Sequence, residues 1–172
     1  MVEIVSSIRP LLPLAVTLIA PFLIWLFRRN INQREAVSFI ASVLAFLAVL
    51  VMVPDVLDGK IPYVTLFTLL PGITISFMAD GLACIFALVA PFLWILVTSY
   101  NVGYMRGLNE HAQTRYYFCF STAIFGAVGV ATAANVFTLY LFYEIISIFT
   151  YPLVAHHQDE EAFSGARKYM VY

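Results

Sequence analysis

The sequence predicts an all-α polytopic membrane protein with five transmembrane helices, the start of a sixth, and an outer-side β-hairpin. Of its 172 residues, 62% are hydrophobic and only 11% are charged, whereas soluble domains carry about 25% charged residues. Five apolar segments are each long enough to cross a bilayer, which takes about 17–25 residues. Between the second and third of these segments, an alternating pattern around a Pro-Gly pair is typical of a hairpin. We therefore treat residues 1–172 as a single membrane domain.

The five predicted spans follow one another with short connections. They cover residues 10–27, 36–53, 81–100, 116–134 and 136–155. The first contains three prolines, which lipid-embedded helices tolerate more readily than soluble ones. The fourth is rich in small residues, and its Gly126 and Gly129 would let another helix approach closely, although general helix packing is enough to explain them. A sixth span is expected to begin near Tyr169.

The hairpin is predicted within residues 54–80. Pro71-Gly72 interrupts this apolar stretch, residues 73–77 alternate with period two, and residues 64–68 alternate in part. A hairpin at the membrane surface fits this pattern better than a further span.

The distribution of basic residues predicts the orientation. Seven of the nine Lys and Arg residues lie in the connections on one side, and only Arg9 and Lys60 lie on the other. The positive-inside rule therefore places the N-terminus and the hairpin outside the cytoplasm. The net charge of −1, without a basic patch, gives no case for a nucleic-acid partner.

Glu144 is the strongest candidate for a functional residue. It is the single charged residue of the fifth span, and it lies about 12 Å along that helix, near the centre of a ~30 Å hydrocarbon core. An ionised group there costs roughly 2.5–3.5 kcal/mol on insertion scales. We expect Glu144 to serve proton or ion translocation. The alternative is a structural carboxyl that is protonated or hydrogen-bonded to a neighbouring helix.

Several other residues are possible accessories to Glu144. Tyr140 lies one turn earlier and could hydrogen-bond the carboxyl, although packing is the favoured role. Asp80 is expected to cap the third span, with ion entry as a second interpretation. His156 and His157 are interpreted as part of a solvated cytoplasmic loop rather than a proton relay or metal site. Lys168 is expected to anchor the sixth span at the inner interface.

The sequence contains no pattern that predicts soluble catalysis. We find no nucleophile paired with a base, no phosphate loop, and no spacing typical of metal ligands. We therefore predict no metal, no cofactor and no catalytic site in the chain itself, and whether it serves an enzyme complex stays open.

Several short motifs occur in a familiar order. Phe-Met-Ala-Asp-Gly-Leu at 77–82 opens the third span, and Tyr-Asn-Val-Gly-Tyr-Met at 100–105 closes it. Asn-Val-Phe at 135–137 begins the fifth span, Leu-Phe-Tyr-Glu at 141–144 lies within it, and Gly-Ala-Arg-Lys-Tyr at 165–169 leads to the sixth. With these motifs the chain resembles the antiporter-like subunits of respiratory complex I, Mrp-type cation/proton antiporters and membrane-bound hydrogenases, most strongly over residues 77–172.

The resemblance implies a role and a set of partners. In the family, a glutamate matching Glu144 pairs with a lysine on a later helix, and Glu144 would be the first ionisable element of a half-channel. Members have about fourteen spans built around two inverted repeats. This chain ends as the sixth begins, so we expect a split subunit or a truncated product whose cation is supplied from elsewhere.

The expected function is that of a subunit contributing part of a proton or sodium path to a respiratory or Mrp-type complex. Its partners would be other membrane subunits and the lipid of a bacterial or archaeal inner membrane. A structural subunit that packs and seals the complex without conducting ions is the alternative. A stand-alone antiporter is disfavoured because the later helices are missing.

Overall fold

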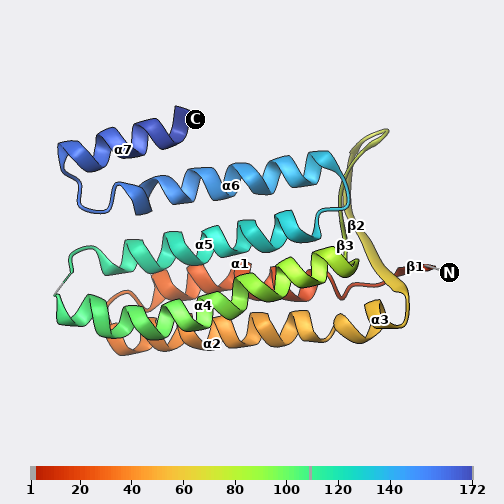
Figure 1. Cartoon of the computed structure of the whole chain (residues 1–172), viewed down its shortest axis with the longest axis horizontal. Coiled ribbons are helices and arrows are strands. Elements are labelled where there is room, and N and C mark those ends of the chain that lie inside the picture. The colour runs from red at the N-terminus through yellow and green to blue at the C-terminus, as the bar shows by residue number, and fades with distance from the viewer. Residues whose placement is uncertain (1–2, 109, 172) are drawn as a thin grey trace.

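The computed structural model describes residues 3–108 and 110–171. A bundle of long helices carries a small sheet at one end (Figure 1). The long helices are α1 (Leu11–Leu26), α2 (Ile31–Leu50), α4 (Gly81–Gly107), α5 (Gln113–Thr132) and α6 (Val136–Val154). The short helix α3 (Val53–Leu57) follows α2, and α7 (Glu160–Val171) folds back beside α6 at the C-terminal end.

The lengths and compositions of these helices suit a membrane. Among the described residues, three helical stretches are long and apolar enough to cross one: Ile31–Leu57, Gly81–Gly107 and Val136–Val154. Helix α1 is apolar but shorter, with 16 residues. Helix α5 has 20 residues and includes many small and polar ones. The chain is therefore a predominantly helical membrane protein with a small sheet.

Three helix boundaries differ from the sequence-based prediction by five residues or more. Helix α2 begins at Ile31 rather than residue 36, because Asn30 caps it by accepting a hydrogen bond from the Gln33 amide at 3.3 Å. Helix α4 continues to Gly107, beyond residue 100. The last helix begins at Glu160, not near Tyr169, because Asp159 accepts a hydrogen bond from the Ala162 amide at 2.7 Å. Hydropathy alone misses such polar first turns.

The sheet has the strand order β1-β2-β3. Strand β2 (Lys60–Leu70) pairs antiparallel with β3 (Ile73–Met78), and Gly72 between them has φ +88°, a value that favours glycine. Strand β1 (Glu3–Ser6) pairs parallel with β2. The sequence did not predict β1, which is short and joins a strand that is distant along the chain.

Strand β3 is attached to the start of α6 by hydrogen bonds. The Ala134 amide donates to the Ser76 carbonyl at 2.9 Å, and the Ser76 amide donates to the Thr138 hydroxyl at 3.1 Å. Asn135 donates from Nδ2 to the Thr74 carbonyl at 2.9 Å and accepts from the Thr138 amide at 2.8 Å. These bonds position the helix that contains Glu144.

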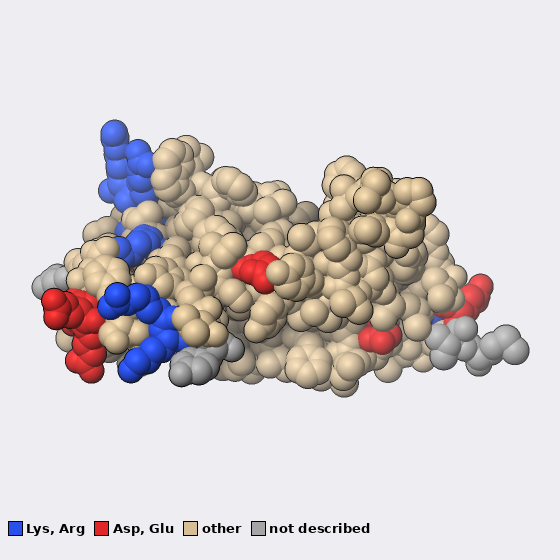
Figure 2. Space-filling view, turned by 90° about the horizontal axis from the view of Figure 1, so that it is seen from above, with Lys and Arg blue, Asp and Glu red and all other residues tan. Residues whose placement is uncertain are grey.

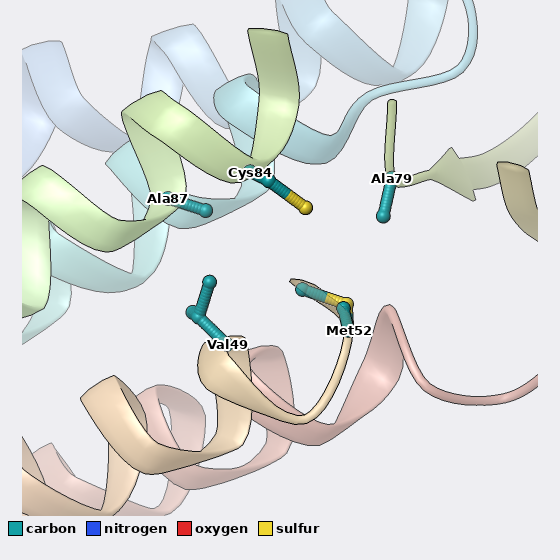
Figure 3. Close-up of a cluster of buried hydrophobic side chains, with 5 residues drawn as sticks. All are labelled: Val49, Met52, Ala79, Cys84 and Ala87. Atoms are coloured by element: carbon teal, nitrogen blue, oxygen red, sulfur yellow. The ribbon is translucent and has the colours of Figure 1, made fainter. Parts of the chain in front are cut away.

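Among the described residues, the core consists of three small apolar clusters between the helices and beside the sheet. In one of them, Val49 near the end of α2 and Met52 just before α3 face Cys84 and Ala87 of α4, with Ala79 beside them (Figure 3). The thiol of Cys84 is buried and free, as is that of Cys119. Cys84 is therefore a packing residue.

Helices α5 and α6 pack closely because α5 has glycine at two positions of contact. A methyl group added at Gly129 would overlap the ring of Phe142, and one at Gly126 would lie 2.7 Å from Ile146 Cγ1. The predicted close approach at these two glycines is confirmed, and the partner is α6.

The charges are distributed unevenly along the bundle. The α1–α2, α4–α5 and α6–α7 connections lie at the end opposite the sheet (Figure 1). Most of the basic atoms visible in Figure 2 also lie toward one end of the long axis, while the middle is almost entirely uncharged. The positive-inside rule depends on such a difference in Lys and Arg content between the two ends of the helices.

Candidate functional site

Glu144 lies at mid-length of α6 and is half-buried. Phe142, two residues earlier, faces the core, whereas Tyr140 and Tyr143 have 57% and 55% of their surface exposed. The carboxyl is therefore at the border between the packed face of α6 and a face that the described chain leaves uncovered. None of the ion pairs formed by the described residues includes Glu144.

Tyr140 is the predicted accessory residue that the structure places nearest to Glu144 along the helix. It lies one turn earlier on the same helix, at the four-residue spacing that brings two side chains to the same face. A phenol and a carboxyl can share a proton in a hydrogen bond. The pair could therefore hold or pass a proton at the edge of the bundle.

Asp80 caps α4. Its Oδ1 accepts a hydrogen bond from the Ala83 amide at 2.7 Å, and its backbone is extended, as expected of a residue that precedes a helix. The predicted capping role is confirmed. Asp80 lies beside the sheet, at the opposite end of the bundle from the histidines (Figure 1).

A buried group of charges at the other end was missed from the sequence. Arg34 and Glu35 in the first turns of α2 have side chains only 4% exposed. Arg106 of α4 donates from Nε to Glu35 Oε2 at 3.0 Å, and Arg34 donates to Gln113 at 2.6 Å and to Thr114 at 2.9 Å. The group joins α2 to α4 and α5. The Asn30 cap is the signal that would have extended α2 to include Arg34 and Glu35.

His156 does not lie in a solvated loop, and that interpretation is wrong. Its side chain is 12% exposed and its ring stacks on that of His111 with centroids 5.0 Å apart. Burial lowers the pKa of His156, and the neighbouring His111 and Arg115 lower it further, while Glu110 opposes them. Sequence reasoning gave His111 no role, because 45 residues separate the two histidines.

The remaining predicted residues stay apart from Glu144. His157 is exposed, with its ring centroid 5.8 Å from that of His156. Lys168 is exposed on α7, and no ion pair among the described residues includes it. The structure thus places Tyr140 beside Glu144, the histidines in a separate cluster, and Asp80 in a helix cap.

Comparison with known proteins identifies relatives of this arrangement. No protein-family model matches the chain. The chain is 30% identical over 165 residues to the Na(+)/H(+) antiporter subunit A1 of Staphylococcus aureus strain bovine RF122 / ET3-1, an alignment that covers 94% of this chain and 20% of the relative. It is 28% identical over 142 residues to a protein of Staphylococcus saprophyticus named as an antiporter subunit, covering 78% of this chain and 17% of the relative.

A solved structure shares the fold. The matching chain belongs to the membrane-bound sulfane sulfur reductase, an archaeal respiratory membrane complex, with a TM-score of 0.84 and 24% identity. The match covers 96% of this chain and 34% of that one. The chain described here spans about a fifth of the length of the curated relatives that it matches.

The helical bundle, its terminal sheet and its long apolar helices define a polytopic membrane protein. The comparisons show that the chain is similar to the antiporter-like membrane subunits. The resemblance predicted from its sequence motifs is therefore confirmed.

Proposed function

We propose that the chain contributes part of a proton or sodium path to a multi-subunit membrane complex, and that Glu144 is the ionisable group of that path. The observation that supports this most directly is the position of Glu144. A single carboxylate occupies mid-length of an otherwise uncharged 19-residue helix, beside Tyr140 and at the edge of an uncovered face. A group that is costly to place in a membrane is usually retained for function.

The path needs a partner for Glu144 that the described residues do not provide. The side of α6 that carries Tyr140 and Tyr143 also exposes 54% of Ile148. These large side chains form an apolar and aromatic surface suited to another membrane helix or to lipid. A cation on a helix packed there would favour the ionised form of the Glu144 carboxyl, and its withdrawal would favour the protonated form. A carboxyl that gains and loses a proton in this way can take part in translocation.

The arrangement in the membrane follows from the same reasoning. In this proposal α1, α2, α4, α5 and α6 span the bilayer and α7 leads into a sixth span. The sheet and the N-terminus face the outside of a bacterial or archaeal inner membrane, and the basic connections face the cytoplasm. Support comes from the basic residues that lie in or next to the connections opposite the sheet: Arg28, Arg29, Arg34, Arg106 and Arg115. Helix α1, at ~24 Å for its 16 residues, would span only with its flanking turns or a thinned bilayer.

A structural role is the second candidate. The glycine-mediated contact of α5 with α6, and the contacts of buried Arg34 and Glu35 with half-exposed Arg106 and with α5, both serve packing without conduction. Under this reading Glu144 would be a neutral, hydrogen-bonded side chain.

Substitution of Glu144 by Gln separates the two candidates. Gln retains the size and polarity of the side chain but cannot ionise. Cation-driven proton movement would be followed in inverted membrane vesicles that contain the assembled complex, with assembly checked by native gel electrophoresis. Loss of proton movement with intact assembly supports translocation. Normal proton movement overturns it and leaves the structural role.

A further inference from the structure

A second cluster of ionisable side chains lies at the end of the bundle opposite the sheet, away from Glu144. Glu110 and His111 belong to the connection between α4 and α5, and His156 belongs to the turn after α6. Glu110 Oε2 lies 3.7 Å from His156 Nε2 and 3.6 Å from His111 Nδ1. One possible ligand atom from each of the three residues lies within 4.8 Å of the other two. Two connections that are distant in sequence thus bring two imidazoles and a carboxylate to one point.

These separations resemble those of a tetrahedral metal site. Zinc binds imidazole nitrogen at about 2.0–2.1 Å and carboxylate oxygen at about 2.0–2.2 Å, so its ligand atoms lie about 3.3–3.5 Å apart in a tetrahedron. The two distances from Glu110 Oε2 exceed this by a few tenths of an ångström. Glu110 Oε2 is common to both distances, so a small shift of that side chain would close the gap while His111 stays in place.

The Nε2 nitrogen of His111 makes the kind of hydrogen bond that the non-ligating nitrogen of a metal-bound imidazole usually makes. His111 Nε2 lies 3.0 Å from the backbone carbonyl oxygen of His156, a bond that requires the proton on Nε2. The lone pair then remains on Nδ1, the atom that faces Glu110. Arg115 donates to the same carbonyl at 2.8 Å and so fixes the turn. Such a contact to a backbone carbonyl orients a ligand ring and increases its basicity.

His156 lacks the contacts that a buried imidazole normally has. Both of its ring nitrogens are buried and neither has a hydrogen-bond partner among the described residues. Buried polar atoms without partners are rare and call for an explanation such as a bound ion. Nε2 points toward Glu110, so a metal ion between them would satisfy it.

From this geometry we propose that Glu110, His111 and His156 bind a divalent transition-metal ion of the zinc class. Water would complete the coordination, as in other sites with two histidines and a carboxylate. Imidazole ligands favour zinc and its neighbours over magnesium or calcium, which prefer oxygen. The ion would tie the α4–α5 connection to the end of the Glu144 helix. This inference does not depend on the proposed ion path.

Zinc binding by the purified full chain in detergent micelles tests the proposal. The chain would be titrated with ZnCl₂ in competition with a chromophoric chelator, and we expect one high-affinity zinc ion per chain. Glu110→Gln and His156→Gln should each weaken that binding by more than about tenfold, since even residues beyond the ligand shell contribute 10–100-fold. His157→Gln is the matched control, because His157 is exposed and adjacent in sequence; it should bind zinc like the parent chain.

The Co²⁺-loaded parent chain provides a readout that does not depend on any variant folding. An intense visible absorption typical of tetrahedral Co²⁺ is expected, whereas a pale octahedral spectrum would contradict the site. Circular dichroism would confirm that each variant retains its helices. The proposal is overturned if the parent chain binds no zinc, if His156→Gln binds as tightly as the parent, or if His157→Gln loses binding equally.

Discussion

The ring of Phe142 lies directly against the backbone of Gly129, with no room for a methyl group between them. The same ring meets Phe77 of β3 edge-on at 5.5 Å and Phe125 of α5 at 5.1 Å. One side chain thus holds α6 against α5 and against the sheet. Because Phe142 precedes Glu144 by two residues, this contact also sets the rotation of α6 that leaves the carboxyl at the edge of the bundle.

Replacing Gly129 by Ala should therefore destabilise the chain. The added methyl group forces Phe142 to move, and overpacking of this kind costs about 1–3 kcal/mol. Thermal unfolding in detergent, followed by circular dichroism, would measure the loss. Gly103→Ala is the control: Gly103 is also helical, but a Cβ there meets nothing within 4 Å. The control should be neutral or slightly stabilising, and equal destabilisation by both changes would contradict the packing described.

Removal of a charge from the buried pair of Arg34 and Glu35 should also destabilise the chain. Glu35→Ala would leave the guanidinium of Arg34, 4% exposed, without its buried counter-charge. Removal of one partner from a buried pair costs about 3–5 kcal/mol, and we expect a large drop in unfolding temperature or in yield. Asp58→Ala is the control, since its pair with Lys60 is exposed and contributes little. A loss no greater than that of the control would show that Glu35 does not stabilise the bundle.

The Asn135 side chain makes two kinds of hydrogen bond: its amide nitrogen donates to the sheet, and its oxygen caps the start of α6. Asn135→Asp keeps the oxygen that accepts from the Thr138 amide but removes the donor to Thr74 and Ser76. Asn135→Ala removes both. Hydrogen–deuterium exchange should be faster around residues 73–76 in both variants, and faster at the start of α6 only in the Ala variant, where the cap is lost. Identical exchange in the two variants would contradict this division.

The helices of this chain were largely predictable from sequence because their apolar runs are local signals. Helix α6 was predicted at 136–155 and is found at 136–154, and Asp80 was predicted as a cap and is one. Polar first turns were not: α2 and α7 begin among charged residues that a hydropathy pattern rejects.

The side-chain clusters depend on contacts between distant segments and were much less predictable. Glu144 stands out because its own helix is apolar, so its neighbours in sequence are enough to identify it. Glu35 with Arg106, and His111 with His156, meet only after the bundle has formed. Strand β1 likewise pairs with a strand more than 50 residues away. Patterns within a single sequence do not show which distant segments will come into contact.

The initial rate of cation-driven proton movement in vesicles containing the complex with Glu144→Asp or Glu144→Gln tests the central claim most directly. The control is Glu161→Gln, the same change at an exposed glutamate of α7. We predict that Gln abolishes proton movement, that Asp retains part of it because it can still ionise, and that the control is unaffected, with equal assembly throughout. Proton movement by the Gln variant at the rate of the parent would contradict the assignment of Glu144 to the ion path.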